Sequence, residues 1–159
     1  MAFEDIVEGY DEGLAIHEGN IREAEERFGV RFPEALREFF LKHNGAIVRD
    51  GFALGRSEYI HGMSRVRCDG HEKYNHEVWV DNGMMMWRRG DQIQKDHAHV
   101  CDVPFLYDDG GNDFVCDTST PLGAVYYVPL DGGCERSPML CESLQEFLDS
   151  IEVRLPGSW

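Results

Sequence analysis

The chain has 159 residues, and 30 aspartates and glutamates against 15 lysines and arginines give it a formal net charge of −15. Such an acidic surface repels DNA, RNA and anionic lipid at long range, whereas it attracts and steers a basic protein. No apolar run approaches the roughly 20 residues that cross a bilayer, and the first residues lack the basic start and apolar run of a secretory signal. We therefore expect a cytoplasmic protein that binds neither nucleic acid nor membrane.

The length predicts a single domain over residues 1–159, large enough to fold without disulfides or metals. The five cysteines are an odd number, and no CxxC pair or regular spacing indicates a disulfide framework or a zinc ribbon. We expect reduced, mostly buried thiols. Nothing in the sequence indicates an oligomeric state.

The start of the chain predicts an acidic helix. Apolar residues from Phe3 to Leu14 recur at helical spacing, which places carboxylates on the opposite face. The acidic residues of this predicted helix are Glu4, Asp5, Glu8, Asp11 and Glu12.

Two further helices follow, joined by a tight corner. Asn20 and Glu23 predict a capping box at the start of one helix, and Gly29 is placed to end it. Pro33 suits the first position of the next helix, which closes at Asn44-Gly45. The inward-facing residues are Ile21, Ala24 and Phe28 in the first of these helices and Leu36, Phe39, Phe40 and His43 in the second.

The middle of the chain predicts short strands and turns. Between Ile47 and His61, short apolar pieces alternate with Gly, Asp, Arg and Ser. Farther on, Val78 and Val80 alternate as in a strand, and a turn at residues 81–83 would lead into residues 84–87. The three methionines in that last run favour helix, so the pattern leaves open the class of the stretch from Cys68 to Asp96.

The stretch from Val103 to Val128 predicts the central hairpin. Phe114-Val115-Cys116 and Ala124 to Val128 are β-prone, and the residues between them are rich in Ser, Thr, Pro and Gly. Ahead of the hairpin, residues 108–113 predict a turn crowded with acidic and amide groups.

A capped helix is expected near the end of the chain. Ser143 and Glu146 form a capping box, and Leu144, Phe147, Leu148 and Ile151 follow at inward-facing positions. Helices at both ends and strands between them predict an α+β fold, with helices packed on one face of a largely antiparallel sheet.

Four pieces of the sequence resemble a known family. They are the helix-corner-helix from Ile21 to Glu34 with Phe39 to Gly45, the Pro104-Phe105 pair with Gly110 to Phe114 and Asp117, the run Gly123 to Tyr127, and the closing run Ser143 to Leu148. In this order, over roughly residues 20 to 148, they are similar to the SUKH superfamily, the Smi/Knr family. The acidic first helix and the stretch from Cys68 to Asp96 depart from the family pattern, which leaves the identity of a partner open.

The resemblance implies a single α+β domain with a twisted sheet and flanking helices. It also implies a protein-binding function. Bacterial members of the superfamily act as immunity proteins that bind and block a cognate toxin, often a nuclease, in polymorphic and contact-dependent toxin systems, and fungal relatives serve as regulatory scaffolds. The family supplies no catalytic residues to carry over.

The charge pattern agrees with a basic toxin as the partner, because a nuclease holds phosphates with Lys and Arg. Residues 96–135 contain eight acidic residues and no Lys or Arg. Our candidates for the partner-binding surface are Asp108, Asp109 and Asp113, together with Glu8, Asp11 and Glu12 of the predicted first helix. The alternative is that the Asp-Gly cluster only turns the chain.

A metal site is the main alternative to a protein-binding surface. His97, His99 and Cys101 carry zinc donors, and so do Asp113, Cys116 and Asp117. The pair His97 and His99 would lie on one side of a strand, but seven histidines in one chain produce such spacing by chance, and the acidic turn lacks the ligand spacing of a calcium loop. We expect no bound metal.

Enzyme activity is the other alternative. In this alternative Cys116, beside Asp117, is a nucleophile paired with His97 or His99, but a cysteine inside an apolar run is more often a small core residue. The sequence contains no GxSxG, Walker, dinucleotide or HExxH motif. We expect a binding protein without catalytic residues or cofactors; a scaffold of the same fold comes next, and a metal-dependent enzyme last.

Overall fold

The computed structural model describes residues 7–8, 16–44, 47–48, 53–55, 59–63, 65–66, 80–81, 86–87, 101–108, 112–129 and 135–154. Within these ranges, side chains are described for residues 16–26, 29–44, 48, 101–108, 112–129 and 135–153.

The main sheet is antiparallel in every pairing between its described strands. Its central path runs in the order β1 (Val7–Glu8), β2 (Ile47–Val48), β4 (Tyr59–Met63), β8 (Asp102–Asp108), β9 (Asp113–Asp117) and β10 (Ala124–Val128). Beside this path, β3 (Ala53–Gly55) pairs with both β4 and β11 (Glu152–Arg154). A smaller antiparallel sheet contains β5 (Arg65–Val66), β6 (Val80–Asp81) and β7 (Met86–Trp87).

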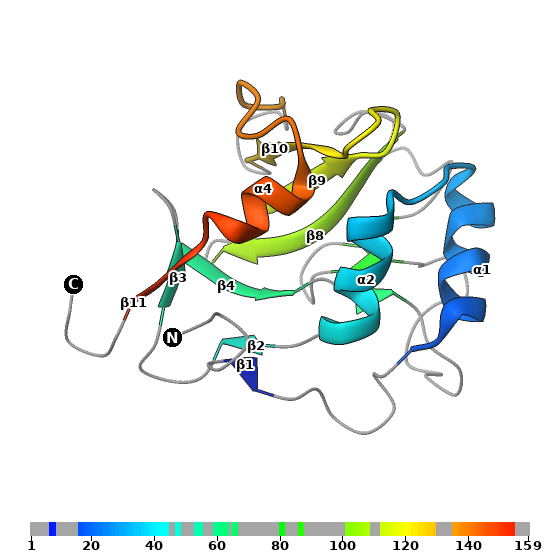
Figure 1. The fold of residues 1–159 in the computed structure, drawn as a ribbon, viewed down its shortest axis with the longest axis horizontal. Helices are drawn as coiled ribbons and strands as arrows, with labels where there is room; N and C mark the ends of the chain where they lie inside the picture. Colours follow the sequence, from blue (N-terminus) through cyan, green and yellow to red (C-terminus); the bar gives the residue numbers. More distant parts are fainter. Residues whose placement is uncertain are drawn as a thin grey trace.

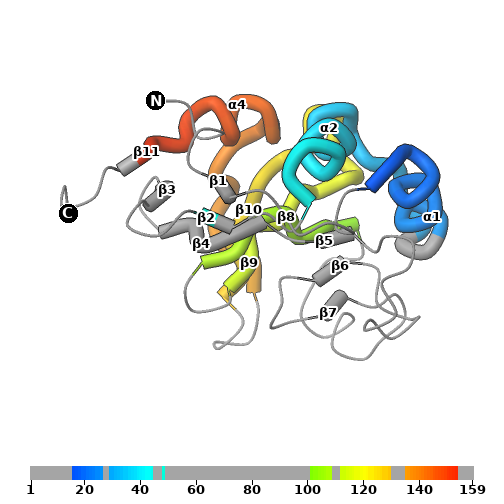
Figure 2. The backbone as a smooth tube through the Cα atoms, turned by 90° about the horizontal axis from the view of Figure 1, so that it is seen from below, coloured from blue at the N-terminus to red at the C-terminus, as the bar shows by residue number. Residues whose placement is uncertain are grey.

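The described helices cover one face of the main sheet (Figures 1 and 2). They are α1 (Glu18–Phe28), α2 (Glu34–His43) and α4 (Leu144–Asp149). This arrangement confirms the predicted α+β fold, with helices packed on a largely antiparallel sheet.

The cap of α1 lies three residues earlier than the sequence predicted. His17 is the N-cap, and its Nδ1 accepts a hydrogen bond from Gly19 N at 3.0 Å. The side chain of Asn20 serves as the return acceptor, since its Oδ1 receives the His17 amide at 3.0 Å. The helix ends as predicted at Gly29, whose φ of 71° suits glycine.

The starts of α2 and α4 follow the sequence signals. Pro33 directly precedes α2, and Ser143 caps α4 by accepting the amide of Glu146 at 3.3 Å. The last helix is shorter than predicted, because it ends at Asp149 and Ile151 lies in the connection to β11.

Phenylalanines join the helices to the sheet. Phe105 of β8 packs edge-on against Phe39 of α2 and Phe147 of α4, with ring centroids 5.6 and 5.8 Å apart. Phe114 of β9 also contacts Phe147, at 5.6 Å. Aromatic pairs of this kind add about 0.5 to 1.5 kcal/mol each beyond the burial of their area. The core therefore fixes α2 and α4 against β8 and β9.

The structure corrects the prediction for the start of the chain. Val7–Glu8 forms strand β1, paired with Ile47–Val48, whereas the apolar spacing predicted a helix there. The rest of that predicted helix lies outside the described residues. The sequence left open the secondary structure from Cys68 to Asp96. Within this stretch Val80 lies opposite Trp87, so β6 and β7 pair as the hairpin interpretation expected.

None of the helices in the described part of the chain combines the length and the apolar character that a membrane span requires.

Candidate binding surfaces

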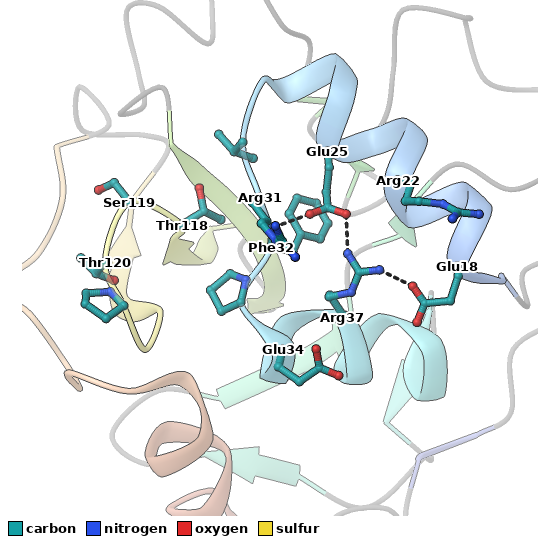
Figure 3. Close-up of a pocket in the computed structure, with 13 residues that line it drawn as sticks. Glu18, Arg22, Glu25, Arg31, Phe32, Glu34, Arg37, Thr118, Ser119 and Thr120 are labelled. Atoms are coloured by element: carbon teal, nitrogen blue, oxygen red, sulfur yellow. Dashed lines mark hydrogen bonds and ion pairs between the residues drawn. The ribbon is translucent and has the colours of Figure 1, made fainter.

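An open groove of about 1070 Å³ separates the α1–α2 helix pair from the β9–β10 turn, residues 118–123 (Figure 3). Its helical side carries three arginines and three glutamates, and its opposite side carries three hydroxyl residues. The charged residues are Arg22, Arg31, Arg37, Glu18, Glu25 and Glu34, and the hydroxyl residues are Thr118, Ser119 and Thr120.

Arg37 joins the two helices along this groove. Its guanidinium donates to the carboxylates of Glu18 and Glu25, both on α1. Burial alone would lower the pKa of Arg37, but the two carboxylates outweigh that effect and the pKa is raised. Glu25 also accepts the amide of Phe32 at 2.8 Å. The helical wall is thus held in one arrangement, with Arg37 already engaged.

The hydroxyls of the opposite wall hold the β9–β10 turn. Thr118 Oγ1 donates to the carbonyl of Cys101 at 2.6 Å. Thr120 Oγ1 donates to the carbonyl of Asp117 and accepts the amide of Ala124, both at 2.7 Å. Both walls of the groove are therefore braced by local hydrogen bonds.

A buried ion cluster lies behind the same turn. Arg136 donates to the carboxylates of Asp102 and Asp117, and its guanidinium carbon lies 4.1 Å above the centre of the Tyr126 ring. Asp102 is 0% exposed and Asp117 is 7% exposed. Burial raises the pKa of Asp117, but hydrogen bonds from Ser119 and Arg136 outweigh it, so the pKa is lowered. Arg136 therefore ties its own segment to β8 and β9.

The segment after Arg136 covers the outer edge of β10. Ser137 N donates to Tyr127 O at 2.8 Å, and Leu140 N donates to Val125 O at 2.8 Å. Val125 N donates back to Cys141 O at 2.9 Å. These bonds occupy the backbone groups that a partner strand would need, so a partner strand cannot pair with β10 at these residues.

The residues predicted to contact a partner differ in their exposure to solvent. Asp113 is 0% exposed in β9, so its burial corrects the expectation of a surface carboxylate there. Asp108 is half-buried and accepts from the amide of Asn112 at 3.0 Å and from Tyr127 Oη at 2.5 Å. Its carboxylate thus braces the turn.

The structure does not describe the side chains of the other predicted contact residues. For Glu8 the backbone is described, in strand β1, and its side chain is not. Asp109, Asp11 and Glu12 lie outside the described residues.

The chemistry around Cys116 does not suit nucleophilic catalysis. Burial, together with the charges of Asp102 and Asp117, raises the pKa of this thiol far above its ordinary value. A reactive cysteine needs the opposite, a depressed pKa that yields thiolate. Its proposed partners His97 and His99 lie outside the described residues. Within the described ranges, no three His, Cys, Asp or Glu side chains are grouped as metal ligands would be.

Sequence reasoning missed an exposed acidic surface near the end of the chain. We use the name C-terminal acidic surface for four exposed carboxylates that lie close together in sequence, those of Glu142, Glu146, Asp149 and Glu152. Glu146 and Asp149 lie three residues apart on α4 and so share a helix face. No Lys or Arg occurs from Ser137 to Val153, and this charge pattern could have revealed the surface.

The family model of the SMI1 / KNR4 family (SUKH-1) matches residues 15–150. The chain belongs to this family. The match confirms the resemblance of the helix pair, the central hairpin and the closing helix, and it runs from just before α1 to just after α4. The single domain expected over residues 1–159 remains a prediction beyond the matched range. No curated protein and no solved structure matches the chain.

Proposed function

We propose that this SUKH-1 protein is an immunity protein that binds a basic protein toxin and blocks it in a stoichiometric complex. Membership in the SMI1 / KNR4 family carries the proposal, because bacterial members of the superfamily act in this way. On this proposal the protein acts in the cytoplasm, without catalysis and without a cofactor.

The charge of the chain supports a basic target. A nuclease must hold phosphates with Lys and Arg, and carboxylates of similar density can occupy the same positions. The net charge of −15 also raises the local concentration of a cationic partner and speeds its association at low salt.

We assign the contact to exposed carboxylates. The C-terminal acidic surface offers four of them with no Lys or Arg between Ser137 and Val153. Asp108, Asp109, Glu8, Asp11 and Glu12 remain candidates for the same contact, and Asp113 leaves the set because it is buried. A basic loop against α4 would meet the carboxylates of Glu146 and Asp149 on one face of the helix.

The test is co-purification of the tagged protein, expressed at native level in its own cells, first at low salt and then at high salt. A basic partner that elutes as salt rises, and whose toxicity the protein suppresses, supports the proposal. Recovery of a partner that is not toxic would overturn the immunity function and favour a regulatory scaffold.

Paired variants then locate the contact. Glu146→Gln with Asp149→Asn removes two charges from the C-terminal acidic surface, and Glu23→Gln with Glu26→Gln removes two exposed charges from α1. Both pairs remove two negative charges, so both should slow association. Dissociation should speed up only in the first pair, because rim charges act on association and contact charges on dissociation. Equal dissociation rates would remove α4 from the contact.

A further inference from the structure

The groove differs in charge from the rest of the protein. Three of the five Lys and Arg residues whose side chains are described line it. Against three glutamates, the three arginines give the lining a formal charge of zero, whereas the whole chain carries −15. The groove lining itself therefore adds no net attraction for a basic partner.

The arginines of the groove are not equivalent. Arg37 is engaged by Glu18 and Glu25, but neither Arg22 nor Arg31 forms an ion pair within the described part of the chain. Arg22 and Arg31 are also exposed. A guanidinium has five donors in a planar fork that fits a carboxylate, so two such groups beside a groove favour an anionic ligand.

The size and surface of the groove favour a chain segment over a small molecule. Its volume of about 1070 Å³ is at the upper limit for small-molecule pockets, which span about 300 to 1,000 Å³. Val30, Pro33 and Pro121 add apolar groups to the lining. Such a mixed surface suits an extended peptide, whose side chains differ along its length.

Two observations favour carboxylates over phosphates as the anionic groups. The lining has no net formal charge, so a second negative charge on the ligand gains nothing from it overall, while the repulsion of the ligand by a chain of net charge −15 doubles. Nucleic acid, with a phosphate at every nucleotide, is repelled by the chain as a whole.

We propose that the groove between the α1–α2 helix pair and the β9–β10 turn binds an extended, carboxylate-bearing segment of a protein partner, and that Arg22 and Arg31 donate hydrogen bonds to its carboxylates (Figure 3). Arg37 holds the helical wall, and Glu34 opposes the anion at the start of α2. This proposal is independent of the immunity function, because it concerns a different surface and the opposite partner charge.

The probe is an acetylated, amidated octapeptide that alternates glutamate with serine, and matched peptides carry glutamine or lysine in place of glutamate. Titration into the ¹⁵N-labelled full chain is followed by backbone amide shifts at about 0.15 M salt, where a Debye length of about 8 Å screens distant carboxylates. The glutamate peptide should shift the amides of Arg31, Arg37, Thr118 and Thr120. Groove shifts with the lysine peptide, equal shifts with the glutamine peptide, or no groove shifts at millimolar glutamate peptide would overturn the proposal.

Matched variants test the residue assignments. Arg31→Gln and Arg22→Gln should each raise the Kd of the glutamate peptide about tenfold, the loss expected for a charged hydrogen bond. Lys42→Gln removes the same charge from exposed α2 outside the groove and should leave the Kd unchanged. Glu34→Gln should lower the Kd, whereas Glu38→Gln, one turn farther along α2, should not. Equal effects of Arg31→Gln and Lys42→Gln would reduce the binding to nonspecific charge and overturn the assignment.

Discussion

Arg136 and Asp102, 34 residues apart in sequence, form an ion pair in which the carboxylate is 0% exposed. The Nε of Arg136 donates to Asp102 Oδ2 at 2.9 Å, and Nη2 reaches both Asp102 and Asp117. The pair fixes the segment that covers the edge of β10 to the central strands β8 and β9. The position of the segment that covers β10 therefore depends on the ion pair with the buried Asp102.

Replacing Arg136 with methionine should destabilise the protein by about 3 to 5 kcal/mol, because the buried carboxylate of Asp102 would lose the guanidinium that neutralises its charge. Urea unfolding measures this loss. Lys42→Met, which removes an exposed charge from α2, should change the free energy of unfolding by no more than about 0.5 kcal/mol.

The double variant Arg136→Met with Asp102→Asn shows whether the loss of stability comes from the buried charge of Asp102 or from the lost packing of Arg136. Removing both charges should restore part of the stability, since the uncompensated carboxylate is gone. If the double variant is as unstable as the sum of the two single variants, the ion pair is not the source of the loss.

The stability of the protein should fall as the pH drops below about 4, near the ordinary pKa of an aspartate. Burial raises the pKa of Asp117, but Ser119 and Arg136 lower it by more, so the folded state holds this carboxylate ionised to lower pH than the unfolded state does. The unfolded state then binds more protons, and acid favours unfolding until the pH passes below the folded pKa.

Urea unfolding between pH 6 and pH 3 measures this dependence. In Asp117→Asn the slope of stability against pH should be smaller than in the wild type, whatever the stability at pH 6. An unchanged slope would show that Asp117 is not one of the groups that lose stability in acid.

The helices could be predicted because their signals are local. Gly29 and Ser143 mark a helix end and a helix start through contacts within a few residues. The N-cap of α1 was misplaced because Asn20, a good cap, serves as the third helical residue and supports His17. Strand β1 was missed because its pairing with Ile47–Val48, about 40 residues away, overrides the helical spacing of the apolar residues.

Local sequence patterns could not predict strand β8 or the groove. Five successive residues of β8, from Asp102 to Leu106, are buried, so its sequence lacks the alternation of a half-exposed strand. The groove assembles side chains from two helices and a turn that are about 100 residues apart in sequence. Net charge predicted an acidic surface, but only the fold shows that Asp113 is buried and that the carboxylates of α4 are exposed.

Gly123→Ala should destabilise the protein by about 2 to 4 kcal/mol, through backbone strain and overpacking. Its φ is 73°, and a Cβ there would lie 2.7 Å from Cys116 Sγ. Thermal or urea unfolding measures the loss. Adding Cys116→Ala removes the sulfur but not the strain, so the double variant should cost less than the two single changes summed. Strict additivity would show that the contact with sulfur contributes nothing.

Glu25 should matter more to stability than Glu18, although both bind Arg37. The Glu25 side chain is 12% exposed and also accepts the Phe32 amide, whereas that of Glu18 is 54% exposed. Glu25→Ala should cost about 1 to 3 kcal/mol, because it leaves a partly buried amide without its acceptor, and Glu18→Ala about 0 to 1 kcal/mol. Glu25→Gln separates the two roles, since it keeps an acceptor for Phe32 while it removes the charge that Arg37 binds. In urea unfolding its loss should fall between those of the two alanine variants; a loss as large as that of Glu25→Ala would assign the stability to the ion pair rather than to the amide.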